Sequence, residues 1–132
     1  MNRYLVIMLV VATVFGYGCK DKTESEIQII TTEEMQELSQ IEDVQLVDIR
    51  TPEERKKGYI ANSQNIDYNS PTFDKEIEKL DKSKPVIVYC KSGNRSAKCA
   101  EKMKNAGFVK IYDLDGGIAT WKYKGFEIKS KP

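Results

Sequence analysis

The chain has 132 residues, 31% of them charged, and a formal net charge of +1 at neutral pH. This length suits one domain with one modest hydrophobic core, and the balanced charge gives no argument for a nucleic-acid partner. The sequence contains no histidine, which excludes sites that pair a serine or cysteine with an imidazole. The lack of histidine also argues against an ordinary zinc site, and we expect no metal and no cofactor.

The first residues have the pattern of an export signal. A short basic start at Arg3 is followed by an apolar run over residues 4–15. This run is too short to span a bilayer and fits the hydrophobic part of a secretory signal peptide. We therefore predict a signal peptide over residues 1–18, a polar tether over 19–26 and one domain over 27–130.

Cys19 follows the small residues of this segment and resembles the lipid-attachment cysteine of a bacterial lipoprotein signal. The pattern departs from the usual one, because Gly16 stands where leucine is preferred. An ordinary signal peptidase would cut the same bond and leave no lipid, and both interpretations export the protein. We expect a location in the bacterial cell envelope, in the periplasm or at the outer surface, with a lipid anchor at Cys19.

After the tether, short apolar strands alternate with amphipathic helices. The strands are rich in β-branched residues, whereas the helices repeat apolar residues every three or four positions. Thr31 and Glu34 have the spacing of a capping box, and Pro52 stands at a favoured first position of a helix. We expect strands over 27–30, 44–49, 86–89 and 111–114, a short strand within 58–66, and helices after Thr31, after Thr51, around 73–80 and over 97–106. The pattern predicts an α/β fold with a small open, mainly parallel sheet and helices on both faces.

The most informative segment is Cys90-Lys91-Ser92-Gly93-Asn94-Arg95-Ser96, between a buried strand and a helix. In open α/β sheets, ligands bind at this end of a strand. Free amides at the helix start and two nearby cations favour negative charge, and glycine lets several amides converge on one anion. We therefore predict a nucleophilic Cys90 with a lowered pKa. The alternative is a buried core cysteine, which would not need this polar loop.

This loop resembles the active-site loop of the rhodanese (sulfurtransferase) family. Three further segments agree with the family in order and spacing, so the resemblance covers about residues 27–128. They are Asp48-Ile49-Arg50 with Glu53, residues 58–66, and Gly116-Gly117-Ile118 with Trp121. The resemblance implies a rhodanese-like fold, a persulfide sulfur on Cys90, and a role for Asp48 and Arg50 in fixing the geometry near the loop. The alternative for Arg50 is a structural ion pair with Glu53 or Glu54.

Two positions depart from the family pattern. Tyr59 stands where the family commonly has histidine, and Asn62 where it commonly has glycine. Asparagine tolerates a left-handed backbone, so we expect the turn at Asn62 to persist. Neither position touches the nucleophile, and we expect the chemistry to be little changed.

The resemblance implies a thiosulfate-type sulfurtransferase that acts as a monomer. The Cys90 thiolate would take the sulfane sulfur of a small anionic donor, and a thiol or cyanide would then remove it. The backbone amides of residues 92–96 would hold the persulfide, and Lys91 and Arg95 would orient the donor. The candidate substrate-binding residues are Lys91, Ser92, Gly93, Asn94, Arg95 and Ser96.

Three alternatives stay open. The loop would look the same in a non-catalytic persulfide carrier. A cysteine-dependent phosphatase or arsenate reductase is disfavoured, because such enzymes have five residues between cysteine and arginine and this chain has four. Cys99 shares the apolar face of its helix and should be buried, although a redox pair with Cys90 is the alternative.

Overall fold

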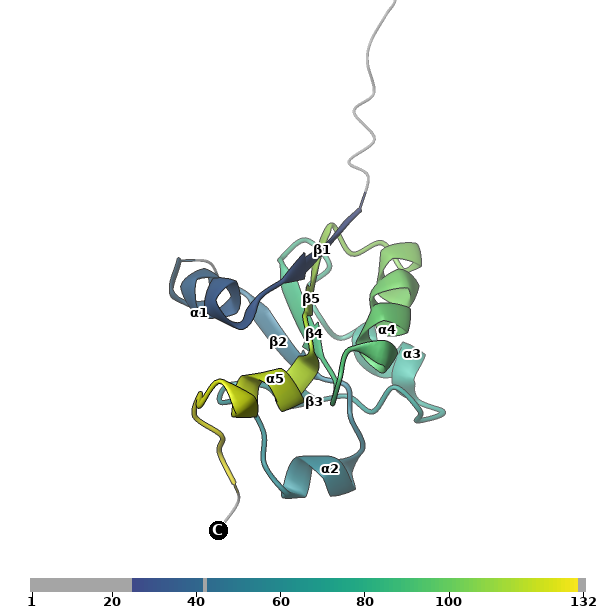
Figure 1. Cartoon of the computed structure of the whole chain (residues 1–132). Coiled ribbons are helices and arrows are strands. Elements are labelled where there is room, and N and C mark those ends of the chain that lie inside the picture. Colours follow the sequence, from purple (N-terminus) through teal and green to yellow (C-terminus); the bar gives the residue numbers. More distant parts are fainter. Residues whose placement is uncertain (1–24, 42, 131–132) are drawn as a thin grey trace, which may run out of the picture.

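The computed structural model describes residues 25–41 and 43–130 (Figure 1). The predicted signal peptide over 1–18, Cys19 and the tether up to residue 24 lie outside the described residues. Within the described ranges, no helix combines the length and the apolar character needed to cross a membrane.

The described strands form one sheet of five. They are β1 (Glu26–Ile30), β2 (Gln45–Asp48), β3 (Gln64–Asn65), β4 (Val86–Tyr89) and β5 (Lys110–Leu114). The strands lie in the order β1-β5-β4-β2-β3, and every neighbouring pair is parallel. The four longer predicted strands are present, with bounds that differ by one residue or less, and β3 lies within the predicted segment 58–66. This confirms the expected parallel α/β sheet.

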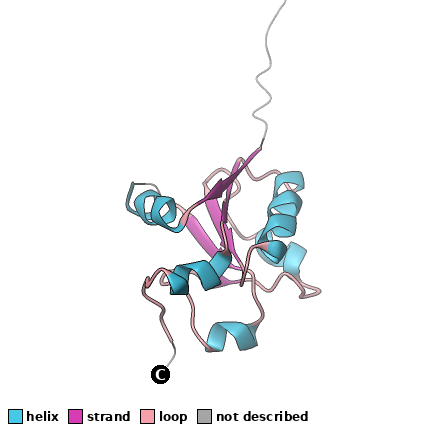
Figure 2. Ribbon diagram, in the orientation of Figure 1, coloured by secondary structure: helices cyan, strands magenta, loops and turns pink. Residues whose placement is uncertain are grey.

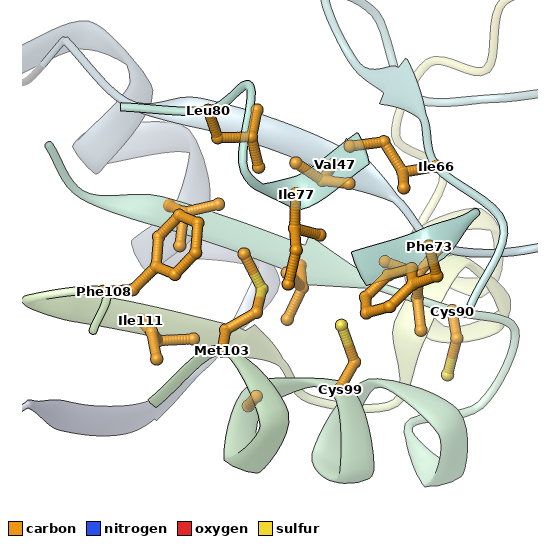
Figure 3. Close-up of a cluster of buried hydrophobic side chains, with 14 residues drawn as sticks. Val47, Ile66, Phe73, Ile77, Leu80, Cys90, Cys99, Met103, Phe108 and Ile111 are labelled. Carbon is orange, nitrogen blue, oxygen red and sulfur yellow. The ribbon is translucent and has the colours of Figure 1, made fainter. Parts of the chain in front are cut away.

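Helices cover both faces of the sheet, as predicted (Figures 1 and 2). They are α1 (Thr32–Ile41), α2 (Pro52–Lys56), α3 (Phe73–Ile77), α4 (Asn94–Asn105) and α5 (Gly117–Tyr123). One hydrophobic cluster lies between the sheet and α3 with α4 (Figure 3). The other lies between the sheet and α1 with α5. The sheet is therefore buried on both sides, which explains why its central strands are almost wholly apolar.

Local side-chain bonds set where the first two helices begin. Glu34 N–H donates to Thr31 Oγ1 at 3.1 Å and Thr31 N–H donates to Glu34 Oε2 at 2.7 Å, which confirms the predicted capping box. Thr51 and Glu54 form a second capping box around Pro52 at the start of α2. These bonds satisfy amides that have no partner within their helix.

Two loop features refine the sequence prediction. Helix α4 begins at Asn94, three residues before the predicted start at Ala97, because Gly93 adopts a left-handed φ of 107° and caps the helix. Asn62 has a φ of 65°, which confirms that asparagine supports the left-handed turn expected there. The helix after β5 was not predicted.

Candidate active site

Cys90 directly follows the fully buried strand β4, and its loop leads into the amino end of α4. The side chain lies at the rim of the hydrophobic cluster under α4 (Figure 3). The residue as a whole is 1% exposed. The structure therefore places the cysteine where parallel strands present ligands, and it also buries that cysteine. Both sequence interpretations of Cys90, loop and core, describe part of its environment.

The Cys90 sulfur lies among hydrogen-bond donors of its own loop. Gly93 N–H donates to Sγ at 3.1 Å and Ser96 N–H donates at 3.4 Å. The thiol in turn donates to Ser96 Oγ at 3.5 Å. Two amides at the start of a 12-residue helix thus converge on one sulfur atom, which is the arrangement that binds an anion at a helix amino end.

These contacts determine the acidity of the thiol. Burial alone would raise the pKa of Cys90, because a charged sulfur loses its hydration. The hydrogen bond with the Ser96 hydroxyl and those from the amides of Ser96, Gly93 and Ser92 outweigh burial, so the pKa of Cys90 is lowered. A cysteine with a lowered pKa has a larger thiolate fraction at neutral pH and is the stronger candidate nucleophile.

Helix α5 holds the loop from the other side. Ile118 N–H donates to the Cys90 carbonyl oxygen at 2.9 Å, and Ala119 N–H donates to that of Lys91 at 2.9 Å. A Cβ on Gly117 would lie 2.4 Å from the Cys90 carbonyl oxygen, which is closer than atoms can approach. The glycine therefore lets α5 pack directly on the loop, and this role of the helix was missed from sequence.

Arg95, one of the two cations predicted to orient the donor, is ion-paired with Glu54 in the structure. Its guanidinium donates to both carboxylate oxygens of Glu54, at 2.6 and 2.8 Å. The hydrogen bond from Arg95 is the largest influence on Glu54 and lowers its pKa to about 2. The pair ties α4 to α2 across the site. Lys91, Ser92 and Asn94 are exposed on the loop surface.

Asp48 and Arg50 form a separate buried network. Arg50 donates to Asp48 Oδ1 at 2.8 Å and to Oδ2 at 2.7 Å, and also to the Gly58 carbonyl oxygen at 2.8 Å. Arg50 forms a structural ion pair, as the alternative predicted, but its partner is Asp48 rather than Glu53 or Glu54, because Glu54 pairs with Arg95. Asp48 and Arg50 thus brace the segment after β2. Their side-chain hydrogen bonds do not reach residues 90–96.

Cys99 is fully buried in the middle of α4, as predicted. Burial raises its pKa to about 12. Both Cys90 and Cys99 are free thiols in the structure. In Figure 3 the Cys99 sulfur points into the hydrophobic cluster, whereas Cys90 lies at the edge of that cluster. This geometry places the two cysteines in different surroundings.

A cavity of about 550 Å³ lies on the opposite face of the sheet, between α1, residues 60–62 before β3, and α5. Met35, Asn62 and Trp121 are among its lining residues, and none of residues 90–96 is. No group of three or more metal-ligating side chains occurs within residues 25–41 and 43–130. The candidate site is therefore the Cys90 loop itself rather than this cavity.

Glu54 and Asp113 each have a feature in the sequence that could have marked them for attention. Glu54 completes the Thr51 capping box, and its spacing from Thr51 was visible in the sequence. Asp113 is an acid inside a buried strand, where charged residues are unusual. Neither feature predicts a contact partner, because Glu54 meets Arg95, and Asp113 meets the Cys90 loop, only in the folded chain.

Comparison with known proteins agrees with this geometry. The chain matches the family model described as a rhodanese-like domain over residues 31–124, which include the Cys90 loop. A thiosulfate sulfurtransferase GlpE of Coxiella burnetii is 35% identical over 86 residues, covering 65% of this chain and 78% of that protein. A sulfurtransferase of Allochromatium vinosum is 33% identical over 93 residues, covering 70% and 85%. The crystal structure of a rhodanese-related protein from Thermoplasma volcanium superposes with a TM-score of 0.71 and 30% identity, covering 79% and 99%.

Proposed function

Because the chain belongs to the rhodanese-like family, we propose that it is a sulfurtransferase that carries sulfane sulfur as a persulfide on Cys90. The observation that carries the proposal is the convergence of the Gly93 and Ser96 amides on the Cys90 sulfur. The same donors that stabilise a thiolate also stabilise the terminal anion of a persulfide.

In the first half-reaction the Cys90 thiolate attacks the sulfane sulfur of a small anionic donor such as thiosulfate. The sulfur–sulfur bond of the donor breaks, and sulfite leaves with the bonding electron pair. Cys90 then carries a persulfide anion, so the charge on the enzyme side is unchanged. Lys91, exposed on the loop, is the cation available to attract the donor, since Arg95 is occupied by Glu54.

In the second half-reaction a thiolate or cyanide attacks the outer sulfur of the persulfide. The sulfur–sulfur bond breaks and Cys90 leaves as a thiolate, which the loop amides again stabilise. Thiocyanate or a new persulfide is the product. Two half-reactions through one covalent intermediate predict ping-pong kinetics.

The test is the intact mass of the purified full chain, before and after thiosulfate and then after cyanide. We expect a gain of one sulfur, about 32 Da, that cyanide reverses and that Cys90→Ala prevents. Cys99→Ala is the matched control and should still load. No gain on a free Cys90 thiol would exclude thiosulfate as donor. Turnover that appears only with a protein partner would favour the carrier alternative.

We also propose that the protein is exported and anchored by a lipid on Cys19. The support is the basic start, the apolar run over 4–15 and the small residues before the cysteine. Mass spectrometry of protein recovered from membranes should find Cys19 as the acylated first residue. A Cys19→Ser variant should be released from the membrane fraction, and an unprocessed amino terminus at Met1 would contradict the proposal.

A further inference from the structure

One buried carboxylate beneath the Cys90 loop has no part in the chemistry described so far. Asp113 in β5 is 6% exposed, and its Oδ1 has no hydrogen-bond partner among the described residues. Burying a carboxylate without a partner is costly. The nearby carboxylates of Asp48 and Glu54 are each paired with arginine. Asp113 is therefore the acid whose position calls for a functional explanation.

Asp113 faces the same side of the sheet as Cys90. It lies opposite Val88 of β4 in the strand register, and Val88 is two residues before Cys90. Side chains two residues apart in a strand lie on one face. The neighbours of Asp113 in β5, Tyr112 and Leu114, belong to the cluster on the other face. Asp113 and Cys90 therefore both point towards α4.

Ser96, in the first turn of α4, acts on both groups. Its Oγ accepts the Cys90 thiol proton at 3.5 Å. Burial raises the pKa of Asp113, and the nearby Ser96 hydroxyl opposes that shift. Ser96 has a single hydroxyl proton, which it donates to the Gly93 carbonyl oxygen at 3.1 Å. That oxygen also accepts Ala97 N–H at 3.2 Å. The Gly93 carbonyl thus keeps a partner when the Ser96 hydroxyl turns away.

We propose that Asp113 receives the proton of the Cys90 thiol through the Ser96 hydroxyl, and so serves as a positioning residue for formation of the thiolate. The S–H bond of Cys90 breaks and its proton joins Ser96 Oγ. The original Ser96 hydroxyl proton passes to Asp113 Oδ1. The result is a Cys90 thiolate that accepts from Ser96, and a neutral Asp113 carboxyl that donates to Ser96. The proposal rests on the proposed function only in taking Cys90 as the reacting thiol.

The transfer is suited to a buried site in a chain that has no histidine. One negative charge moves from the carboxylate to the sulfur, so the buried net charge does not change. Burial raises the pKa of Asp113, and the loop donors lower that of Cys90. The two groups are therefore closer in acidity than a free carboxyl and a free thiol, and a proton shared between them through Ser96 would make them titrate together.

The other titratable groups around Asp113 have separate roles. Asp115, exposed on the same strand end, adds a like charge that raises the Asp113 pKa. On α4, Cys99 has its pKa raised to about 12 by burial and by the nearby charge of Asp113, so it stays protonated. Lys102 of α4 is ion-paired with Asp74 at 2.9 Å. On the β1 side the register partner of Asp113 is the apolar Ile29.

The test is the rate of Cys90 alkylation by iodoacetamide from acidic to alkaline pH, with the modified peptide identified by mass spectrometry. In the wild-type full chain we expect two inflections, because loss of the first proton already places part of the population as thiolate with neutral Asp113. Asp113→Asn should lose the lower inflection and leave one. Ser96→Ala should lose it too, since the bridging hydroxyl is gone.

Asp115→Asn is the matched control, because it removes a nearby acid of the same strand end and should keep both inflections. Circular dichroism establishes that each variant is folded. A single inflection in the wild type overturns the proposal even if Asp113→Asn does not fold, and two inflections in folded Asp113→Asn overturn it as well. Alkylation needs no sulfur donor. Failure of the relay is therefore distinct from failure to load sulfane sulfur.

Discussion

Cys90 and Cys99 are about equally buried, at 1% and 0% exposure. The pKa values of their thiols are nevertheless shifted in opposite directions. Burial raises the pKa of Cys99 to about 12. Burial also acts on Cys90, and there the loop hydrogen bonds outweigh it and lower the pKa. The two residues lie nine positions apart in one strand–loop–helix unit. Burial therefore does not decide whether a cysteine in this protein is reactive.

The difference comes from the backbone around each sulfur. Cys99 sits in the middle of α4, where amides are already bonded within the helix. Cys90 lies before the amino end of the same helix, where amides have no helical partner and point at the sulfur. The lesson is that unbonded amides, rather than exposure, make the candidate nucleophile.

The largest expected effect is on the rates of thiol modification. At about pH 8 we expect iodoacetamide to modify Cys90 at least about a hundredfold faster than Cys99, because the thiolate fractions differ strongly. Peptide mapping by mass spectrometry over time measures both rates in one sample. Comparable rates at the two cysteines in folded protein would contradict the conclusion that the loop amides make Cys90 the more reactive thiol.

A second experiment asks whether the charges beside the loop stabilise the fold. Glu54→Gln should lower the free energy of unfolding at neutral pH by about 2 kcal/mol, because it breaks the partly buried pair with Arg95. The pKa of Glu54 falls from 4.5 to about 2 in the folded chain. Its stabilisation is therefore complete above about pH 4.5 and is lost as the pH falls towards 2.

Urea unfolding of wild type and Glu54→Gln across this pH range measures the effect. The difference between the two proteins should close as the pH approaches 2. Glu53→Gln is the matched control, since Glu53 is the exposed neighbour in the same helix turn. Equal loss of stability in both variants would show that the Arg95 pair contributes nothing specific.

The smallest expected effect comes from two glycine substitutions, which separate the cost of backbone strain from a change in the Cys90 pKa. Gly93 and Gly107 both have a positive φ, of 107° and 95°, so alanine at either position should cost roughly 1–2 kcal/mol of stability. Of these two glycines, only Gly93 donates its N–H to the Cys90 sulfur. Alanine keeps the N–H but disfavours this backbone conformation, so we expect Gly93→Ala to weaken the hydrogen bond to the sulfur and raise the Cys90 pKa. Gly107→Ala should leave the Cys90 pKa unchanged. The pH dependence of alkylation checks this, and equal pKa values in the two variants would contradict it.

Local patterns in the sequence were enough to predict most of the fold. The apolar β-branched runs predicted the strands to within a residue, because each central strand is buried on both faces. Capping-box spacing predicted the start of α1. The position of Cys90 between a strand and a helix was also readable, since both neighbours have a clear period. These features depend on residues close together in the chain.

Contacts between distant segments could not be predicted in this way. Arg95 meets Glu54, which lies 41 positions earlier, and this pairing leaves the arginine bound rather than free. The carbonyl groups of the Cys90 loop are held by α5, a helix that no sequence pattern had indicated. In each case the parallel sheet brings together segments that no pattern in the sequence links.

The sequence alone is enough to predict that a cysteine in a polar, glycine-containing loop follows a buried strand. It could not determine that Asp113 lies on the same face of the sheet as that cysteine. The pairing of β5 with β4 places Asp113 opposite Val88. Register depends on the packing of both sheet faces, so only the tertiary structure sets a buried acid beneath the Cys90 loop.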